Sequence, residues 1–138
     1  MPALPTVGGS SGTWGTELNT WLLTAHNPDA TLKDIILNTQ TASYTLVLAD
    51  SGKVVEMNVA SANSVTVPAN ASVAFPIGTM IAIDQIGAGQ TGIVAASGVT
   101  IRSVSGYLKV SGQYSGVTLR KRATNEWVLV GALTLGVV

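Results

Sequence analysis

The sequence predicts a mainly β protein, an antiparallel β-sandwich or barrel with one N-terminal amphipathic helix. In residues 44–130, short runs rich in Val, Ile and Thr alternate apolar with polar positions. Clusters of Gly, Ser, Asn, Asp and Pro separate these runs at regular intervals, as turns do. Between residues 14 and 25, apolar residues recur with helical spacing instead. Because 138 residues support one core, we expect residues 1–40 to form an arm and helix for attachment or assembly, and residues 41–138 to form one β domain.

The chain begins with a segment that has the composition of an extended arm. Residues 1–12 contain two Pro, three Gly and two Ser and show little periodicity. They lack a basic segment followed by an apolar one, so we expect no signal peptide and a protein made and kept in a cytoplasm. Since no apolar stretch reaches the roughly 18 residues of a spanning helix, we expect no membrane segment. We expect the arm to dock onto a partner.

A helix is predicted from near residue 14 to near residue 26. Five apolar residues have the spacing i, i+4, i+7, i+8 and i+11, which places them on one helical face. They are Trp14, Leu18, Trp21, Leu22 and Ala25. Thr13 is placed to cap the first turn, and Asn27 followed by Pro28 ends the helix. Two Trp on one face bury a large apolar area, so we assign assembly or docking to Trp14, Leu18, Trp21 and Leu22, with ordinary core packing as the alternative.

Nine segments carry the pattern of β-strands. They are Tyr44–Ala49, Lys53–Val59, Ser64–Val67, Thr79–Ile86, Gly92–Ala95, Val99–Arg102, Tyr107–Val110, Tyr114–Arg120 and Glu126–Val130. Residues 32–38 are apolar without a clear period, and we assign them no element. The segment Ser97–Arg102 is echoed at Ser115–Arg120. This echo predicts two similar strands with Val and Ile or Leu on one face and Thr and Arg on the other.

Composition excludes several classes of function. No Cys is present, so disulfides, thiolate metal sites and Cys nucleophiles are absent. Seven basic and seven acidic residues give no net charge, and the one basic run, Arg120–Arg122, is typical of a solvated strand edge. We therefore expect no nucleic-acid partner. The carboxylates are scattered and no Ser has the setting of a nucleophile, so we expect no enzyme and no catalytic residues.

Two local patterns resemble ligand sites but lack the required context. Residues 87–92 match G-x-G-x-x-G, yet a strand is expected after them and no carboxylate stands about 20 residues on. We interpret them as a glycine-rich hairpin turn and expect no cofactor. His26, the only His, lies near the predicted helix end, where the dipole favours a cation. Its spacing to Asp29 and Asp34 fits no recognised ligand set, so we expect no metal.

Three aromatic residues in the C-terminal half are candidates for contact with a sugar. Tyr107, Tyr114 and Trp127 have planar faces on which a glycan ring can stack. Core packing is the interpretation that we prefer, because the chain has one Phe and its core needs bulk. Glycan contact by these three residues is the alternative.

The scarcity of charge points to assembly. Charged residues make up 10% of the chain, and its mean hydropathy is +0.42, whereas the surfaces of small soluble domains usually carry about 25–35% charged residues. Asp84 is the only ionisable residue between Met57 and Ile101. We therefore expect copies of the chain, or a partner, to cover much of the outer surface.

Two stretches resemble surface proteins of tailed-bacteriophage virions. Residues 14–22, Trp-Gly-Thr-Glu-Leu-Asn-Thr-Trp-Leu after a Leu-Pro arm, are similar to the W-G-x-x-L-N-x-W-L segment near the start of many phage fibre proteins. Residues 44–58 and a series of later segments resemble a small β-domain of phage fibre and head decoration proteins. The later segments are Ser64–Pro68, Phe75–Thr79, Gly87–Thr91, Leu119–Arg122 and Glu126–Leu129.

The resemblance implies a virion structural protein that is commonly a homotrimer, is attached to the particle by its N-terminal part and has no catalytic residues. The chain has no long shaft, and its brevity favours a capsid decoration or cement protein, or a head fibre. Its partners would be itself and the major capsid protein or another virion protein. A short tail fibre or receptor-binding tip that recognises a host surface glycan is the alternative.

Overall fold

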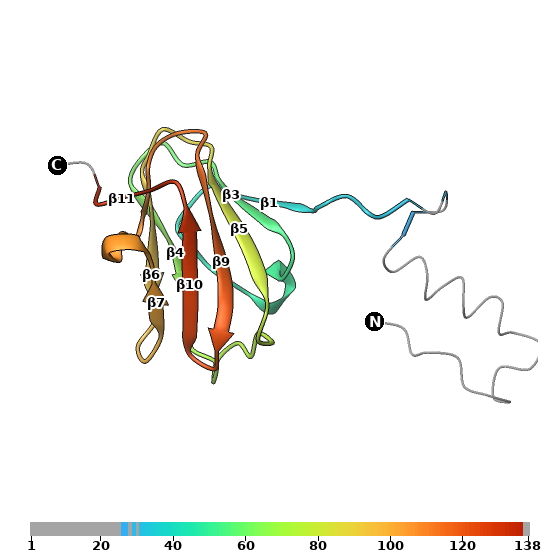
Figure 1. Ribbon diagram of the computed structural model, residues 1–138. Helices are drawn as coiled ribbons and strands as arrows, with labels where there is room; N and C mark the ends of the chain where they lie inside the picture. Colours follow the sequence, from blue (N-terminus) through green and yellow to red (C-terminus); the bar gives the residue numbers. More distant parts are fainter. Residues whose placement is uncertain (1–25, 28, 30, 137–138) are drawn as a thin grey trace, which may run out of the picture. The chain divides into compact units, whose positions relative to one another are not determined.

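The computed structural model describes residues 26, 27, 29 and 31–136 (Figure 1). The chain divides into residues 1–34 and residues 35–138, and the described strands and 3₁₀ helices all lie in the second unit. The strands are β1 Leu37–Gln40, β2 Tyr44–Thr45, β3 Val54–Met57, β4 Asn63–Val67, β5 Met80–Gln85, β6 Thr91–Ala95, β7 Thr100–Arg102, β8 Lys109–Val110, β9 Gly116–Ala123, β10 Glu126–Gly131 and β11 Leu133–Thr134. The two 3₁₀ helices are η1 Leu48–Asp50 and η2 Val104–Gly106. The described part is therefore mainly β, as predicted.

The strands form two mixed sheets. The six-stranded sheet has the order β1-β3-β5-β9-β10-β7, and the five-stranded sheet has the order β11-β8-β6-β4-β2. Strands β1, β3 and β5 run parallel, as do β2, β4 and β6, and β7 is parallel to β10. The antiparallel pairs are those that include β8 or β9. The prediction of an antiparallel fold is thus wrong for the other pairs, and the sheets do not close into a barrel.

The parallel pairing arises because the first six strands alternate between the sheets. After each of these strands the chain crosses to the other sheet instead of turning back, so β1, β2, β3 and β4 each pair in parallel with the strand two places later. In the six-stranded sheet the register joins Leu37 to Val54 and Val54 to Ala82. Because side chains alternate with a period of two in both kinds of sheet, the sequence pattern did not distinguish parallel from antiparallel pairing.

The glycine-rich segment 87–92 is one of the corners where the chain crosses between sheets. Gly87 N donates to Met57 O at 3.0 Å, and Gly89 N donates to Val59 O at 2.9 Å. A Cβ at Gly87 would overlap the backbone of Val59, and a Cβ at Gly89 would overlap that of Ser61. The glycines therefore let this corner lie directly against the corner between β3 and β4. The interpretation as a hairpin turn is wrong, since β5 and β6 belong to different sheets.

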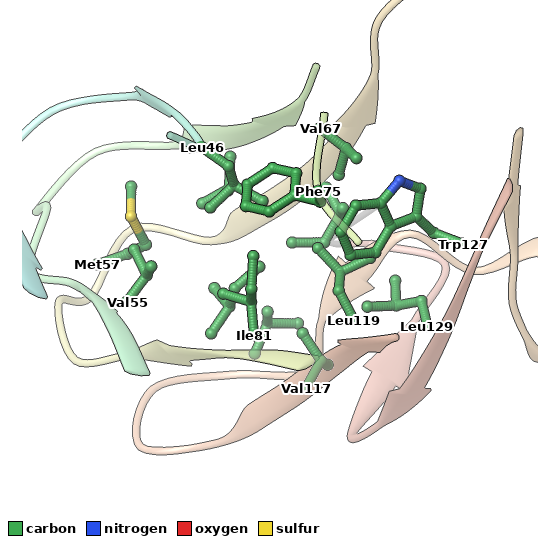
Figure 2. Packing of buried hydrophobic residues seen from close by; sticks show 14 of the residues in the cluster. Leu46, Val55, Met57, Val67, Phe75, Ile81, Val117, Leu119, Trp127 and Leu129 are labelled. Atoms are coloured by element: carbon green, nitrogen blue, oxygen red, sulfur yellow. The ribbon is translucent and has the colours of Figure 1, made fainter. Parts of the chain in front are cut away.

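Both sheets contribute to one hydrophobic cluster, seen from close by in Figure 2. Phe75, in the loop between β4 and β5, meets Trp127 of β10 edge to face, with ring centroids 5.5 Å apart and planes at 85°. The buried hydrophobic residues are Leu46, Val55, Met57, Val59, Val65, Val67, Phe75, Ile81, Ile83, Ile93, Val110, Val117, Leu119, Trp127 and Leu129. Alternate residues of the inner strands fill this core, so the residues between them point outward.

Most of the strand predictions are confirmed, since β3 to β10 overlap the segments predicted from Lys53 onward. The prediction for Tyr44–Ala49 is wrong beyond Thr45, where β2 ends and η1 follows. The buried Asp50 carboxylate causes this turn, because it accepts hydrogen bonds from Val47 N at 2.8 Å and from Tyr44 Oη at 3.0 Å. Strands β1 and β11 were not predicted.

The helix predicted near residues 14–26 lies outside the described residues, apart from His26. His26 forms an isolated antiparallel β-bridge with Leu32. The echoed segments become β7 and β9, which flank β10. Their predicted facing is confirmed in β9, where Leu119 is buried and Arg120 exposed, and Arg102 of β7 is exposed as well.

Candidate functional site

The outer face of the six-stranded sheet carries an uncharged row of residues that crosses five strands. The register aligns one outward residue from each of β1, β3, β5, β9 and β10. These residues, called the central row below, are Leu37, Val54, Ala82, Thr118 and Val130. Leu37 at one end of the row is 57% exposed, and Val130 at the other end is 52% exposed. An aligned uncharged surface of this kind is typical of a contact with another protein.

Two carboxylates lie level with each other on one side of the central row. Glu56 of β3 is in register with Asp84 of β5 and with Thr39 of β1, whose Oγ1 donates to Glu56 Oε2 at 2.9 Å. Burial raises the pKa of Asp84, and the negative charge of Glu56 raises it further. On the next strand Gly116 faces Asp84, where a Cβ would overlap the carboxylate. We call Thr39, Glu56 and Asp84 the acidic row.

Arginine side chains stand on the other side of the central row. Arg120 is two positions along β9 from Thr118 of the central row, and Arg122 is two positions further. Glu126 of β10 forms ion pairs with Arg122 and, at 3.5 Å, with Arg102 of β7. The hydrogen bond from Arg122 lowers the pKa of Glu126 most, and that from Arg102 lowers it further. Three Arg and one Glu give this side a net positive charge. We call Arg102, Arg120, Arg122 and Glu126 the basic side.

The outer face of the five-stranded sheet has a different composition. Its outward residues are mostly small or hydroxylated: Thr45, Ser64, Thr66, Gly92, Val94, Lys109 and Thr134. Val94, 45% exposed, is the large hydrophobic residue among them. On the six-stranded sheet, Met80 of β5 is 53% exposed in addition to Leu37 and Val130, and Ile35 just before β1 is 67% exposed. Among residues within the strands, the six-stranded sheet therefore has three exposed large apolar side chains and the five-stranded sheet has one, while Leu48 after β2 and Leu135 after β11 are exposed outside the strands.

Lys121 is buried, which corrects the prediction that Arg120–Arg122 is a solvated run. Strand alternation points Arg120 and Arg122 outward and Lys121 into the core, where it is 2% exposed. Its Nζ donates to Asn70 Oδ1 at 2.5 Å and to Phe75 O at 2.6 Å, and lies 5.9 Å from the centroid of the Trp127 ring. Burial lowers the pKa of Lys121. The residue holds the loop between β4 and β5 against β9.

The three aromatic candidates for glycan contact lie in different environments. Trp127 is 1% exposed and packs in the core, so it offers no face to a sugar. Tyr107 is half-buried after η2. Tyr114 is 78% exposed in the turn between β8 and β9, with a φ of 62° and a hydrogen bond from its N–H to Gln85 O at 2.7 Å. Of the three, Tyr114 presents an aromatic ring to solvent.

The other predicted residues lie in or beside the first unit. The assembly residues Trp14, Leu18, Trp21 and Leu22 are outside the described part of the chain. The Asp29 carboxylate accepts hydrogen bonds from Thr31 Oγ1 at 2.6 Å and from Thr31 N at 3.1 Å, and these lower its pKa. Within the residues that the structure describes, no three His, Cys, Asp or Glu side chains are grouped to hold a metal ion. No helix in the described part has the length and apolar character needed to cross a membrane.

Comparison of the chain with known protein families, with curated proteins and with solved structures found no match. The sequence alone does not predict the central row, because its members come from five strands and only the register aligns them. The scarcity of charge predicted a covered surface without saying which face it is.

Proposed function

We propose that this chain is a non-enzymatic structural protein of a bacteriophage virion, a homotrimeric β-sandwich module that decorates or cements the capsid or forms a head fibre. The central row is the observation that carries the proposal, because it is an uncharged row across a sheet face that a protein acting alone would leave in water. The resemblance of residues 14–22 and 44–129 to phage fibre and virion-surface proteins supplies the virion setting. Residues 1–40 are the proposed attachment to the particle.

Such a protein acts through burial rather than chemistry. Copies that bridge neighbouring capsid subunits remove apolar surface from water, which contributes about 25 cal/mol per Å² before the costs of association. The shared core of the two sheets and the Lys121 contacts keep the surface in one shape. A fixed shape lowers the entropy lost on binding. The partners are other copies of the chain and the major capsid protein or another virion protein.

Labelling of intact virus particles tests this proposal. Gold-coupled antibody against the protein is applied to purified particles and imaged by electron microscopy. We expect label over the head. Absence of label from every particle, with the antibody shown to bind the purified protein, would overturn the virion role.

A short tail fibre or receptor-binding tip that binds a host surface glycan is the second candidate. The exposed ring of Tyr114 favours it, since a solvent-facing aromatic in a turn offers a platform for a sugar. Label at the tail, together with binding of the purified protein to host cells that is lost in Tyr114→Ala, would select this function over decoration. Val94→Ala, at an exposed residue of β6, is the control and should leave cell binding unchanged.

A further inference from the structure

We propose that the outer face of the six-stranded sheet binds the same face of a second copy with the strands antiparallel, so that the row of Asp84 in each copy faces the row of Arg120 in the other. This inference deepens the proposed function, on which it rests, by naming the partner and geometry of one assembly contact. It is separate from the three-fold contact, which we assign to the N-terminal residues that include Trp14 and Trp21.

The composition of the two outer faces selects the six-stranded sheet. Its central row is uncharged from Leu37 to Val130, and Met80 adds exposed apolar area next to it. Within its strands, the five-stranded sheet presents Ser, Thr and Lys109 around a single exposed large apolar residue, Val94. Apolar area is the component of an interface that gains most from leaving water. A second copy therefore has more to cover on the six-stranded sheet.

The size of the face fits a reversible contact between two copies. Five strands about 4.8 Å apart and three outward rows about 6.6 Å apart give a face of about 24 Å by about 20 Å. Two such faces in contact bury about 1,000 Å² in total, which is near the lower limit for a specific interface. We therefore expect the two copies to associate reversibly, with a dissociation constant in the micromolar range.

The charges on either side of the central row fix the orientation. Glu56 and Asp84 form a negative edge, whereas Arg102, Arg120 and Arg122 with Glu126 form a positive one. If the two copies ran parallel, each acidic row would face the other across the contact and repel it. In the antiparallel orientation the acidic row of one copy faces the basic side of its partner, which is the complementary arrangement.

With a two-fold axis along the central row, every contact away from the axis occurs twice. In such an isologous interface, if one residue meets a second residue of the partner, the second meets the first in return. The axis exchanges the row of Asp84 with the row of Met80, and Arg120 is in register with Met80 on the neighbouring strand. The expected contacts are thus two equivalent pairs between Asp84 and Arg120, with the central rows between them.

Charge exchange on the full chain tests the inference by sedimentation velocity. The wild type should sediment as an even number of copies, two, or six if the three-fold contact forms as well. Arg120→Asp and Asp84→Arg should each halve that number, and the double variant should restore it. Val130→Lys should also halve it, because it places a charge in the central row. Circular dichroism checks the fold of each variant, and Arg120 and Val130 are exposed positions that tolerate substitution.

Matched controls on the other sheet separate this contact from general effects of charge. Lys109→Asp repeats the charge reversal of Arg120, and Val94→Lys repeats the substitution of Val130, both on the outer face of the five-stranded sheet. Both controls should keep the wild-type copy number. A wild type with one or three copies up to high micromolar concentration would overturn the inference, as would single variants that dissociate without rescue in the double variant. The copy number does not depend on where the protein lies on a virus particle, so failure of the labelling experiment is distinguishable from failure here.

Discussion

Lys121 Nζ donates a hydrogen bond to Asn70 Oδ1 at 2.5 Å and thereby joins strand β9 to the loop between β4 and β5. The same ammonium donates to the carbonyl of Phe75, whose ring packs against Trp127. Both acceptors are neutral, so the charge is held by dipoles and by the nearby indole ring rather than by a carboxylate. The loop thus depends on one buried side chain for its position.

We expect Lys121→Met to lower the free energy of unfolding by about 1–3 kcal/mol, since it leaves buried acceptors without their donor. Urea unfolding followed by Trp fluorescence measures the change, because Trp127 lies beside the substituted residue. Arg122→Met, one position further and exposed, is the control and should change stability by no more than about 0.5 kcal/mol. Equal effects of the two substitutions would contradict the role given to Lys121.

Gly89→Ala should destabilise the fold by about 1–3 kcal/mol, because the added Cβ overlaps the backbone of Ser61 and the two corners must separate. The hydrogen bond from Gly89 N to Val59 O would be strained at the same time. Thermal unfolding measures the effect. Gly112→Ala is the control, since a Cβ there meets no atom within 4 Å. If Gly89→Ala were as well tolerated as Gly112→Ala, close stacking of the corners would not be needed.

The strands could be predicted from the sequence because burial of one face imposes a period of two, and β5 and β10 follow that period closely. The same rule applied to Arg120–Arg122 would have placed Lys121 inward between two outward Arg. We predicted a solvated run instead, because Lys usually lies in solvent and we gave this preference more weight than the strand alternation. Strand β1 was missed because it begins at the end of a run of three apolar residues, Ile35 to Leu37, that does not alternate.

The sheet topology and the candidate surface could not be predicted in the same way. Leu37 and Val130 lie at opposite ends of the β domain's sequence, and four registered pairs of strands are needed to place them in one row. Register is a property of pairing between distant segments, so a local pattern does not contain it. The corner at residues 87–89 gave a local cue for close backbone approach, but not for the segment that approaches it.

Tyr114→Gly should raise the free energy of unfolding by about 1 kcal/mol, because Tyr114 has a φ of 62° and glycine adopts that conformation without steric strain. The side chain is 78% exposed, so its removal loses little burial. Gln113→Gly, at the preceding position, serves as the control and should destabilise, since it relieves no positive φ and removes a hydrogen bond to Ile86 O. Urea midpoints of the two variants give the comparison, and a destabilised Tyr114→Gly would show that the tyrosine ring contributes to the turn.

Asp84→Asn should stabilise the fold at neutral pH and have no effect in strong acid. The pKa of Asp84 is raised from its ordinary value of 3.8, first by burial and then by Glu56. The folded state therefore binds more protons than the unfolded state as pH rises from about 3.8 to the raised pKa, and the free energy of unfolding falls over that window. Above the window the ionised Asp84 keeps the fold less stable than it would be with a neutral side chain.

Unfolding curves between pH 3 and pH 8 measure this difference, and the Val130→Lys background removes the contribution of contact through the sheet face. The gain from Asp84→Asn should appear as pH rises above about 3.8 and reach a plateau. Glu56→Gln should give a smaller gain in the free energy of unfolding, because burial of Asp84 remains. The double variant should gain less than the sum of the two single gains, because either substitution removes the same repulsion. A gain from Asp84→Asn that is equally large at pH 3 would show that packing, rather than ionisation, is the cause.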